Sequence, residues 1–260
     1  MSRDNFIIWV YCLVCTYYEA VIKDYPVRRG GGFTPKLTDA EVLTMEICGE
    51  YFPQQTDKAI FRYFRSHYPH FFPNLTDRTL FVRQAANLWQ ISELIQQRMV
   101  EGGGQRTANW QVIDTLPIPI CRITRAKRSC FRGFDADYGY CAAKREHYYG
   151  FKLGLRVSPL GMIVHYPLLQ ARSHDVLFLE DLVGDFRGDL IGDKGFLDQW
   201  RRQQLQSQGV CLRTPTRRNM KMENGWNDTL AHFRKLVETV GSQLTQQFHL
   251  QSLKLRSFWH

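Results

Sequence analysis

The stretch Asp189-Leu-Ile-Gly-Asp-Lys-Gly-Phe196 carries the pattern that decides the fold. Leu190-Ile191 is a short apolar run, which is typical of a buried strand. Gly192 and Gly195 bracket Asp193, and glycine allows the chain to turn sharply just past a strand end. We therefore expect Asp193 to lie at the mouth of a sheet. A carboxylate in such a place is costly unless a positive group neutralises it.

Two further acids occur in comparable settings. Asp114 ends the strand-like run Trp110-Gln-Val-Ile-Asp114, and Glu238 lies in the helical stretch Leu230–Glu238. We predict that the three carboxylates converge on divalent metal, because Mg²⁺ and Mn²⁺ prefer hard oxygen ligands. Other interpretations stay open on spacing alone. Turn or N-cap chemistry explains Asp114 and Asp193 equally well, and an ion pair with Arg234 explains Glu238.

Composition narrows the class of partner. The chain has 260 residues, enough to bury a sizeable core, and 34 basic against 25 acidic residues give it a net charge of +9. That excess favours a polyanion, usually nucleic acid. The seven cysteines form no regular framework, and Cys12 and Cys15 lie in the apolar stretch Phe6–Tyr18. We expect a reduced, cytosolic protein with no membrane partner, because that stretch is too short to span a bilayer.

The first hundred residues predict an all-helical region. Thr38-Asp-Ala-Glu41 is a capping box that opens a helix to about Tyr51, and Thr76-Asp77 begins a long helix to about Met99. Arginines among aromatic residues suit DNA contact there, although a solvated helical face is the alternative. The glycine-rich segment Glu101–Arg106 marks a domain boundary. We expect a helical N-terminal region over 1–100, which is a candidate for DNA binding, and a second domain over 107–260.

The second domain alternates strands and helices. A hairpin is predicted over Tyr148–Ser158 and Met162–Leu169, after a basic, irregular segment at Arg122–His147. A sheet with helices packed on its faces fits the order of elements. The remaining predicted elements are a helix over Ser173–Leu182, a strand over Leu190–Asp193, a helix over Leu197–Gln208, a strand over Val210–Thr214 and a helix over Trp226–Phe248.

Several motifs, taken in order, make a resemblance specific. They are Val-Ile-Asp114, Tyr148-Tyr-Gly-Phe-Lys152-Leu, Ala171-Arg-Ser-His-Asp175-Val, Gly192-Asp193-Lys-Gly-Phe196 and Arg234-Lys-Leu-Val-Glu238. Over about Val112–Phe248 the chain resembles the DDE transposases of bacterial insertion sequences. Ala231 and Thr245 stand where the family's helix signature has Tyr and Lys, so the chain resembles a divergent branch. Relatives usually continue with another helix, so a truncated C-terminus is an open interpretation alongside an intact one.

The resemblance implies an α/β fold: an RNase H-like mixed sheet flanked by helices and preceded by an all-helical N-terminal region. It implies Mg²⁺-dependent (or Mn²⁺-dependent) cleavage at element ends and strand transfer into target DNA. Asp114, Asp193 and Glu238 are then the catalytic and metal-binding residues. The implied partner is DNA, both terminal inverted repeats and target, bound by a homodimer or larger assembly in the cytoplasm, at the nucleoid.

Candidate DNA contacts follow from charge and position. Arg234, one helical turn before Glu238, can hold a terminal phosphate bidentately or orient the carboxylate. His174-Asp175 has two interpretations, an auxiliary acid near the metals or a helix cap. Two other functions stay open: an RNase H-fold nuclease that does not join DNA, and a truncated transposase relic that only binds it. The remaining candidates for phosphate contact are Lys152, Lys194, Arg128, Arg217, Arg218 and Lys221.

Overall fold

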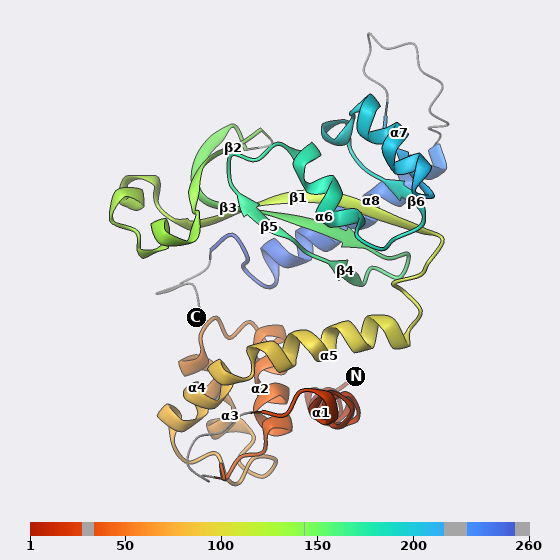
Figure 1. Ribbon diagram of the computed structural model, residues 1–260. Helices are drawn as coiled ribbons and strands as arrows, with labels where there is room; N and C mark the ends of the chain where they lie inside the picture. Colours follow the sequence, from red (N-terminus) through yellow and green to blue (C-terminus); the bar gives the residue numbers. More distant parts are fainter. Residues whose placement is uncertain (28–33, 143, 216–227, 253–260) are drawn as a thin grey trace. The chain divides into compact units, whose positions relative to one another are not determined.

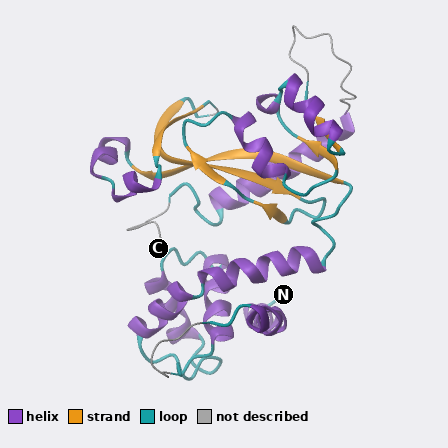
Figure 2. Cartoon of the chain, viewed as in Figure 1, coloured by secondary structure: helices purple, strands orange, loops and turns teal. Residues whose placement is uncertain are grey.

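The computed structural model describes residues 1–27, 34–142, 144–215 and 228–252 (Figure 1). The chain divides into two compact units, one spanning Met1–Met99 and the other beginning at Val100. Helices make up the first unit, and the sheet belongs to the second (Figure 2).

The N-terminal unit begins each of its first four helices with a side-chain cap. Thr38 shows the expected capping box: its hydroxyl accepts from the Glu41 N–H at 3.2 Å, and the Glu41 carboxylate accepts from the Thr38 N–H at 2.7 Å. Ser2, Thr56 and Asp77 cap the other three helices. The helices are α1 (Arg3–Asp24), α2 (Asp39–Tyr51), α3 (Asp57–His67), α4 (Arg78–Asn87) and α5 (Trp89–Gly102).

Helix α1 is long and apolar enough, by length and composition, to cross a membrane. Its buried residues Ile7, Val10, Val14 and Val21 repeat at spacings of three, four and seven, so they form one stripe. That stripe belongs to the hydrophobic cluster of the N-terminal unit and packs with α2. The rest of the helix is more open: 22% of its most apolar 18-residue window is buried, and Ile8, Trp9 and Tyr11 are exposed. The helix, with 22 residues, is longer than the stretch Phe6–Tyr18 that was expected to be too short to span a bilayer.

The long helix predicted from Thr76 to Met99 is two helices, so that prediction was wrong. Helix α4 ends at Asn87 and α5 begins at Trp89. Leu88, between them, is 1% exposed, and its N–H bonds the Ala85 carbonyl three residues back at 3.0 Å. This tightened turn ends the first helix. Burial of Leu88 in the core accompanies this break in the helix. No local sequence pattern predicts the break.

The C-terminal unit is built on a mixed sheet with the order β2-β3-β1-β6-β7, and β4 and β5 also pair with β3. Strand β3 runs antiparallel to β1 and β2, whereas β6 runs parallel to β1 and β7. The expected fold class, a mixed sheet flanked by helices after a helical region, is confirmed. The strands are β1 (Trp110–Cys121), β2 (Asp137–Cys141), β3 (Glu146–Val157), β4 (Ile163–His165), β5 (Leu168–Gln170), β6 (Gly188–Ile191) and β7 (Val210–Arg213).

Alternation along β1 and β6 separates the two faces of the sheet. Ile113 and Leu190 pack on one face with η4 (Asp175–Phe178), α6 (Leu179–Val183) and α7 (Gln199–Ser207). Val112 and Ile191 pack on the other face against α8 (Asp228–Gln246). Figure 1 shows α6 in front of the sheet and α8 behind it. Because side chains alternate, residues two positions beyond Val112 or Ile191 face α8.

Strand β1 continues past Asp114, which was expected to end it. On β1, only Trp110–Val112 pair with β6, so beyond Val112 that edge of β1 pairs with no other strand in the described part of the chain. Pro117 and Pro119 fall in this stretch, where the missing N–H costs no ladder hydrogen bond. Asp114 therefore lies where the parallel pairing ends, not where the strand ends.

Two other segments differ from the sequence expectation. The segment predicted to be irregular contains η2 (Ile123–Arg128), η3 (Cys130–Phe134) and β2, held by a hydrophobic cluster that includes Ile118 and Phe131. The second arm of the hairpin is two short strands, β4 and β5, separated at Tyr166 and Pro167. Both pair with β3, so the hairpin itself is present.

Candidate active site

The parallel register of β1 and β6 puts two aspartates at the same level. Val112 pairs with Ile191, and Asp114 and Asp193 each follow two residues later. Neighbouring strands lie about 4.8 Å apart. Since Asp193 keeps extended backbone angles, we conclude that both side chains face α8 from adjacent positions.

Helix α8 brings the third acid to the same face. The rings of Trp110 and Phe233 stack with centroids 4.1 Å apart. Eight residues along the helix, a Cβ on Gly241 would lie 3.3 Å from a Leu116 methyl group. These two contacts lay α8 along the first half of β1. Glu238 lies between them on the helix, as Asp114 lies between them on the strand.

Arg234 joins two of the acids directly. Its Nη2 lies 3.0 Å from Glu238 Oε1, and its Nη1 lies 3.5 Å from Asp193 Oδ1. The helical ion pair considered for Glu238 is therefore present, but the same guanidinium also reaches Asp193. Asp193 occupies the N-cap position of η5 (Lys194–Phe196), yet its side chain makes no capping hydrogen bond. Its carboxylate is directed to Arg234 instead.

Burial and neighbouring charges shift the pKa of Asp114. The Thr115 N–H donates to Asp114 Oδ1 at 2.8 Å. Burial raises the pKa of Asp114 to about 6; the Thr115 hydrogen bond and the Arg234 charge oppose the rise, and the charges of Asp193 and Asp175 add to it. The half-buried Asp114 thus shares one electrostatic neighbourhood with Asp193 and Arg234.

The three carboxylates are suitable ligands for a divalent cation, but they are not arranged as a complete coordination site. Among the described residues, no three His, Cys, Asp or Glu side chains are grouped so that they could hold a metal ion as they stand. Arg234 is the positive group between Asp193 and Glu238. All three side chains offer oxygen donors, which are the ligands that a hard divalent cation prefers.

The candidate DNA contacts fall into three groups. Lys194 and Arg128 are exposed, whereas Lys152 is 17% exposed and donates to Asp175 Oδ1 at 3.2 Å and to the Ser173 carbonyl at 2.6 Å. The ammonium of Lys152 is therefore directed into the protein. Arg217, Arg218 and Lys221 lie outside the described residues. A DNA contact for each of these stays a prediction.

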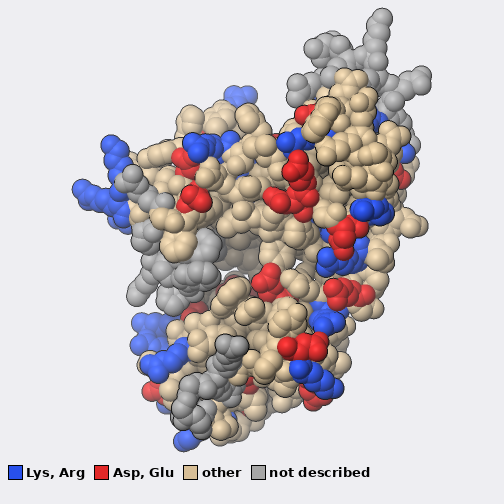
Figure 3. Space-filling model, in the orientation of Figure 1, with Lys and Arg blue, Asp and Glu red and all other residues tan. Residues whose placement is uncertain are grey.

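A basic lobe lies on the β1–β2 connection. Arg122, Arg125, Lys127 and Arg128 of this connection are exposed. Figure 3 shows Lys and Arg side chains projecting at the edge of the molecule where Figure 1 draws this segment in green. Such a cluster suits the backbone of a nucleic acid.

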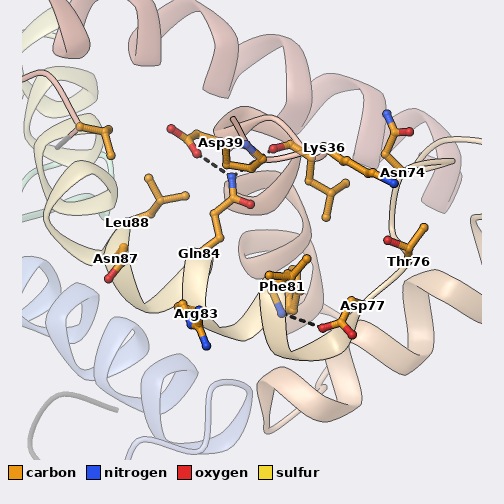
Figure 4. Close-up of a pocket in the computed structure, with 14 residues that line it drawn as sticks. Lys36, Asp39, Asn74, Thr76, Asp77, Phe81, Arg83, Gln84, Asn87 and Leu88 are labelled. Atoms are coloured by element: carbon orange, nitrogen blue, oxygen red, sulfur yellow. Dashed lines mark hydrogen bonds between the residues drawn. The ribbon is translucent and has the colours of Figure 1, made fainter. Parts of the chain in front are cut away.

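The N-terminal unit holds a separate pocket of about 340 Å³ beside α4. Asp39 and Gln84 point toward one another on its wall, and the Asp39 carboxylate accepts from the Gln84 amide at 2.7 Å (Figure 4). The Asp39 carboxylate also accepts from the Tyr18 hydroxyl at 2.6 Å. These bonds hold α1, α2 and α4 together, so the polar wall is part of the packing of this unit.

Sequence reasoning missed the partners of Asp175. The His174-Asp175 pair was left between a cap and an auxiliary acid. His174 takes the N-cap position of η4 without a side-chain cap bond, whereas Asp175 accepts from the Thr115 hydroxyl at 2.8 Å and from Lys152. Each of these residues lies in or beside a quoted motif, but no spacing rule joins the motifs.

The C-terminal unit is therefore a mixed sheet with one antiparallel and one parallel half, flanked by helices. A family model described as "Transposase DDE domain" matches residues 104–258, more than half of the chain. The chain belongs to this family, as the motifs predicted.

Comparison with other known proteins gives one distant likeness. No curated protein sequence matches the chain. A solved structure titled "Cryo-EM structure of piggyBac transposase synaptic complex with hairpin DNA (SNHP)" is similar at 12% sequence identity with a TM-score of 0.44. The likeness covers 85% of this chain and 50% of that one, so the chain spans half the length of that relative.

Proposed function

We propose that the protein is an insertion-sequence transposase in which Asp114, Asp193 and Glu238 catalyse metal-dependent DNA cleavage at element ends and strand transfer into target DNA. The family match supports the class. The observation that carries the residue assignment is the shared level of Asp114 and Asp193 beneath the helix that bears Glu238. The proposed setting is the cytoplasm, with a dimer or larger assembly on the DNA.

Each of the chain's own residues has a role in this proposal. Asp114, Asp193 and Glu238 would hold Mg²⁺ or Mn²⁺, which when bound supplies activation of the attacking oxygen and stabilisation of the leaving one. Asp114 must be ionised for this, and the Thr115 N–H stabilises its charged form. Arg234 would turn its guanidinium to a DNA phosphate, which it can bind through two N–H groups. The exposed basic residues Arg128 and Lys194 would add affinity without sequence choice.

The test uses a DNA fragment carrying the sequence that flanks the gene. Wild-type protein is expected to nick it with Mg²⁺ or Mn²⁺, and Asp193→Asn to lose nicking while gel-shift affinity stays within about threefold. Unchanged nicking by Asp193→Asn would refute the assignment.

A second substrate, pre-cleaved at the element end, separates the alternatives. Joining to a target plasmid identifies a transposase, and nicking without joining identifies a nuclease of the same fold. Binding without nicking, even with Mn²⁺, identifies a DNA-binding relic.

A further inference from the structure

Asp175 lies on the far face of the sheet from α8, directly behind the proposed catalytic aspartates. Thr115 follows Asp114 in β1, so its side chain points to the opposite face, the face of Ile113, η4 and α6. There the Thr115 hydroxyl donates to Asp175 Oδ1 at 2.8 Å. Asp175 therefore binds β1 one residue from Asp114, but on the opposite face of the sheet.

The second oxygen of Asp175 lies against the turn that carries Asp193. A Cβ on Gly195, two residues after Asp193, would lie 2.5 Å from Asp175 Oδ2. Only glycine lets η5 approach the carboxylate this closely. One side chain thus contacts the backbone segments of both aspartates, one on β1 and one after β6.

Lys152 fixes Asp175 in turn. Its ammonium donates to Asp175 Oδ1 at 3.2 Å and to the Ser173 carbonyl at 2.6 Å, and the side chains are 17% and 33% exposed. A partly buried carboxylate with a cation and a hydroxyl on one oxygen has little freedom to move. The Lys152–Asp175 pair places two charges on a face of the sheet where most neighbouring side chains are apolar.

We infer that Asp175, held by Lys152, is a positioning residue that sets the separation of Asp114 and Asp193 by binding Thr115 and abutting Gly195. It is not a fourth ligand, because it lies on the opposite face of the sheet. The inference rests on the proposed function and deepens it, assigning to Lys152 an internal role in place of a phosphate contact. Residues that orient ligands in this way typically change metal affinity by 10- to 100-fold when replaced.

The test measures Mn²⁺ binding by the full-length protein with calorimetry, independently of cleavage. Thr115→Val removes the hydroxyl at nearly constant shape, and Asp175→Asn removes the charge at constant size. Each is expected to melt within about 5 °C of wild type and to weaken the Mn²⁺ dissociation constant about tenfold. Because both act on the Thr115–Asp175 contact, the double variant is expected to lose less than the product of the two losses.

The matched control is Asp189→Asn. Asp189 lies near the start of β6, the strand that leads to Asp193. Its carboxylate forms an ion pair with Arg213 of β7 at 3.0 Å. It is expected to bind Mn²⁺ as wild type does. A dissociation constant within twofold of wild type for both Thr115→Val and Asp175→Asn, or an equal loss in Asp189→Asn, would overturn the inference.

Wild type and Asp193→Asn distinguish failure of the inference from failure of the proposed function. If Asp193→Asn loses Mn²⁺ binding and Thr115→Val does not, the metal site stands and the positioning role falls. If wild type binds no Mn²⁺, or Asp193→Asn binds it as wild type does, the proposed site falls and the inference with it. A Mg²⁺ titration of nicking adds a second readout. Positioning predicts that more Mg²⁺ restores part of the rate in Thr115→Val and none in Asp193→Asn.

Discussion

The rings of Trp110 and Phe233 stack face to face, 4.1 Å between centroids and 9° between planes. This pair joins the first residue of β1 to the second turn of α8. Glu238 lies five residues further along the helix, so the stack sets both the angle and the register at which Glu238 meets the sheet.

Phe233→Ala should therefore lower both stability and activity. Removing a half-buried stacked ring is expected to cost about 2 kcal/mol in the free energy of unfolding, less than for a fully buried phenylalanine. Urea denaturation measures this cost. Trp200→Ala is the control, since Trp200 is 67% exposed and its loss is expected to stay within about 0.5 kcal/mol. Equal costs for the two variants would show that the stack does not hold α8.

Arg234→Gln should make the protein more responsive to Mg²⁺. The change removes the positive charge between Asp193 and Glu238, so the two carboxylates repel one another in metal-free buffer and the melting temperature falls by a few degrees. Added Mg²⁺ is expected to raise the melting temperature of the variant more than that of wild type. Differential scanning fluorimetry at several Mg²⁺ concentrations measures the difference.

The control for that experiment is Arg213→Gln, which breaks the ion pair with Asp189 away from the proposed site. It is expected to show the Mg²⁺ response of wild type. If Mg²⁺ raises the melting temperatures of wild type, Arg234→Gln and Arg213→Gln equally, Arg234 does not occupy the position of a bound metal ion.

Asp114→Asn should stabilise the protein above pH 6 while abolishing cleavage. The folded-state pKa of Asp114 is about 6 against an ordinary value of 3.8. The folded protein therefore holds this proton more tightly, and stability falls as pH rises from about 4 to about 6 and stays lower above. Asparagine cannot ionise, so at pH 8 the variant is expected to be about 3 kcal/mol more stable.

Urea denaturation in EDTA at pH 4 and pH 8 tests the Asp114 prediction. The two proteins should differ little at pH 4, where the wild-type carboxyl is largely protonated in the folded state. A variant less stable than wild type at pH 8 would contradict the assigned pKa.

Glu46→Gln should stabilise the N-terminal unit at neutral pH. Burial raises the pKa of Glu46 to about 8, and the charges of Asp57 and Glu50 add to the rise. Its Oε1 atom is buried with no hydrogen-bond partner in the described structure. Wild-type stability is therefore lost as pH rises from about 4.5 toward 8. The variant is expected to gain about 4 kcal/mol at pH 7.5 and little at pH 4.

Thermal melts at the two pH values measure the Glu46 effect. Glu19→Gln, at an exposed position of α1, is the control and should change neither melt. A gain of the same size at both pH values would show that packing, not ionisation, separates Glu46→Gln from wild type.

The sequence by itself determined the local elements and the class of protein. The Thr38 to Glu41 capping box and the glycines around Asp193 act within a few residues, so local chemistry predicts them. The order of motifs predicted the DDE family, and the three acids were named from their settings. Local rules failed where burial decided the outcome, as at Leu88, which divides one expected helix into two.

The tertiary structure alone decided which acids meet and what stands behind them. The shared level of Asp114 and Asp193 depends on the parallel register of β1 with β6, which strands far apart in the chain set by packing. The contacts of Asp175 join η4 to Thr115 of β1 and to Gly195 of η5, the turn that follows β6. Sequence spacing cannot encode such contacts, because they arise only when the sheet closes and one face is buried separately from the other.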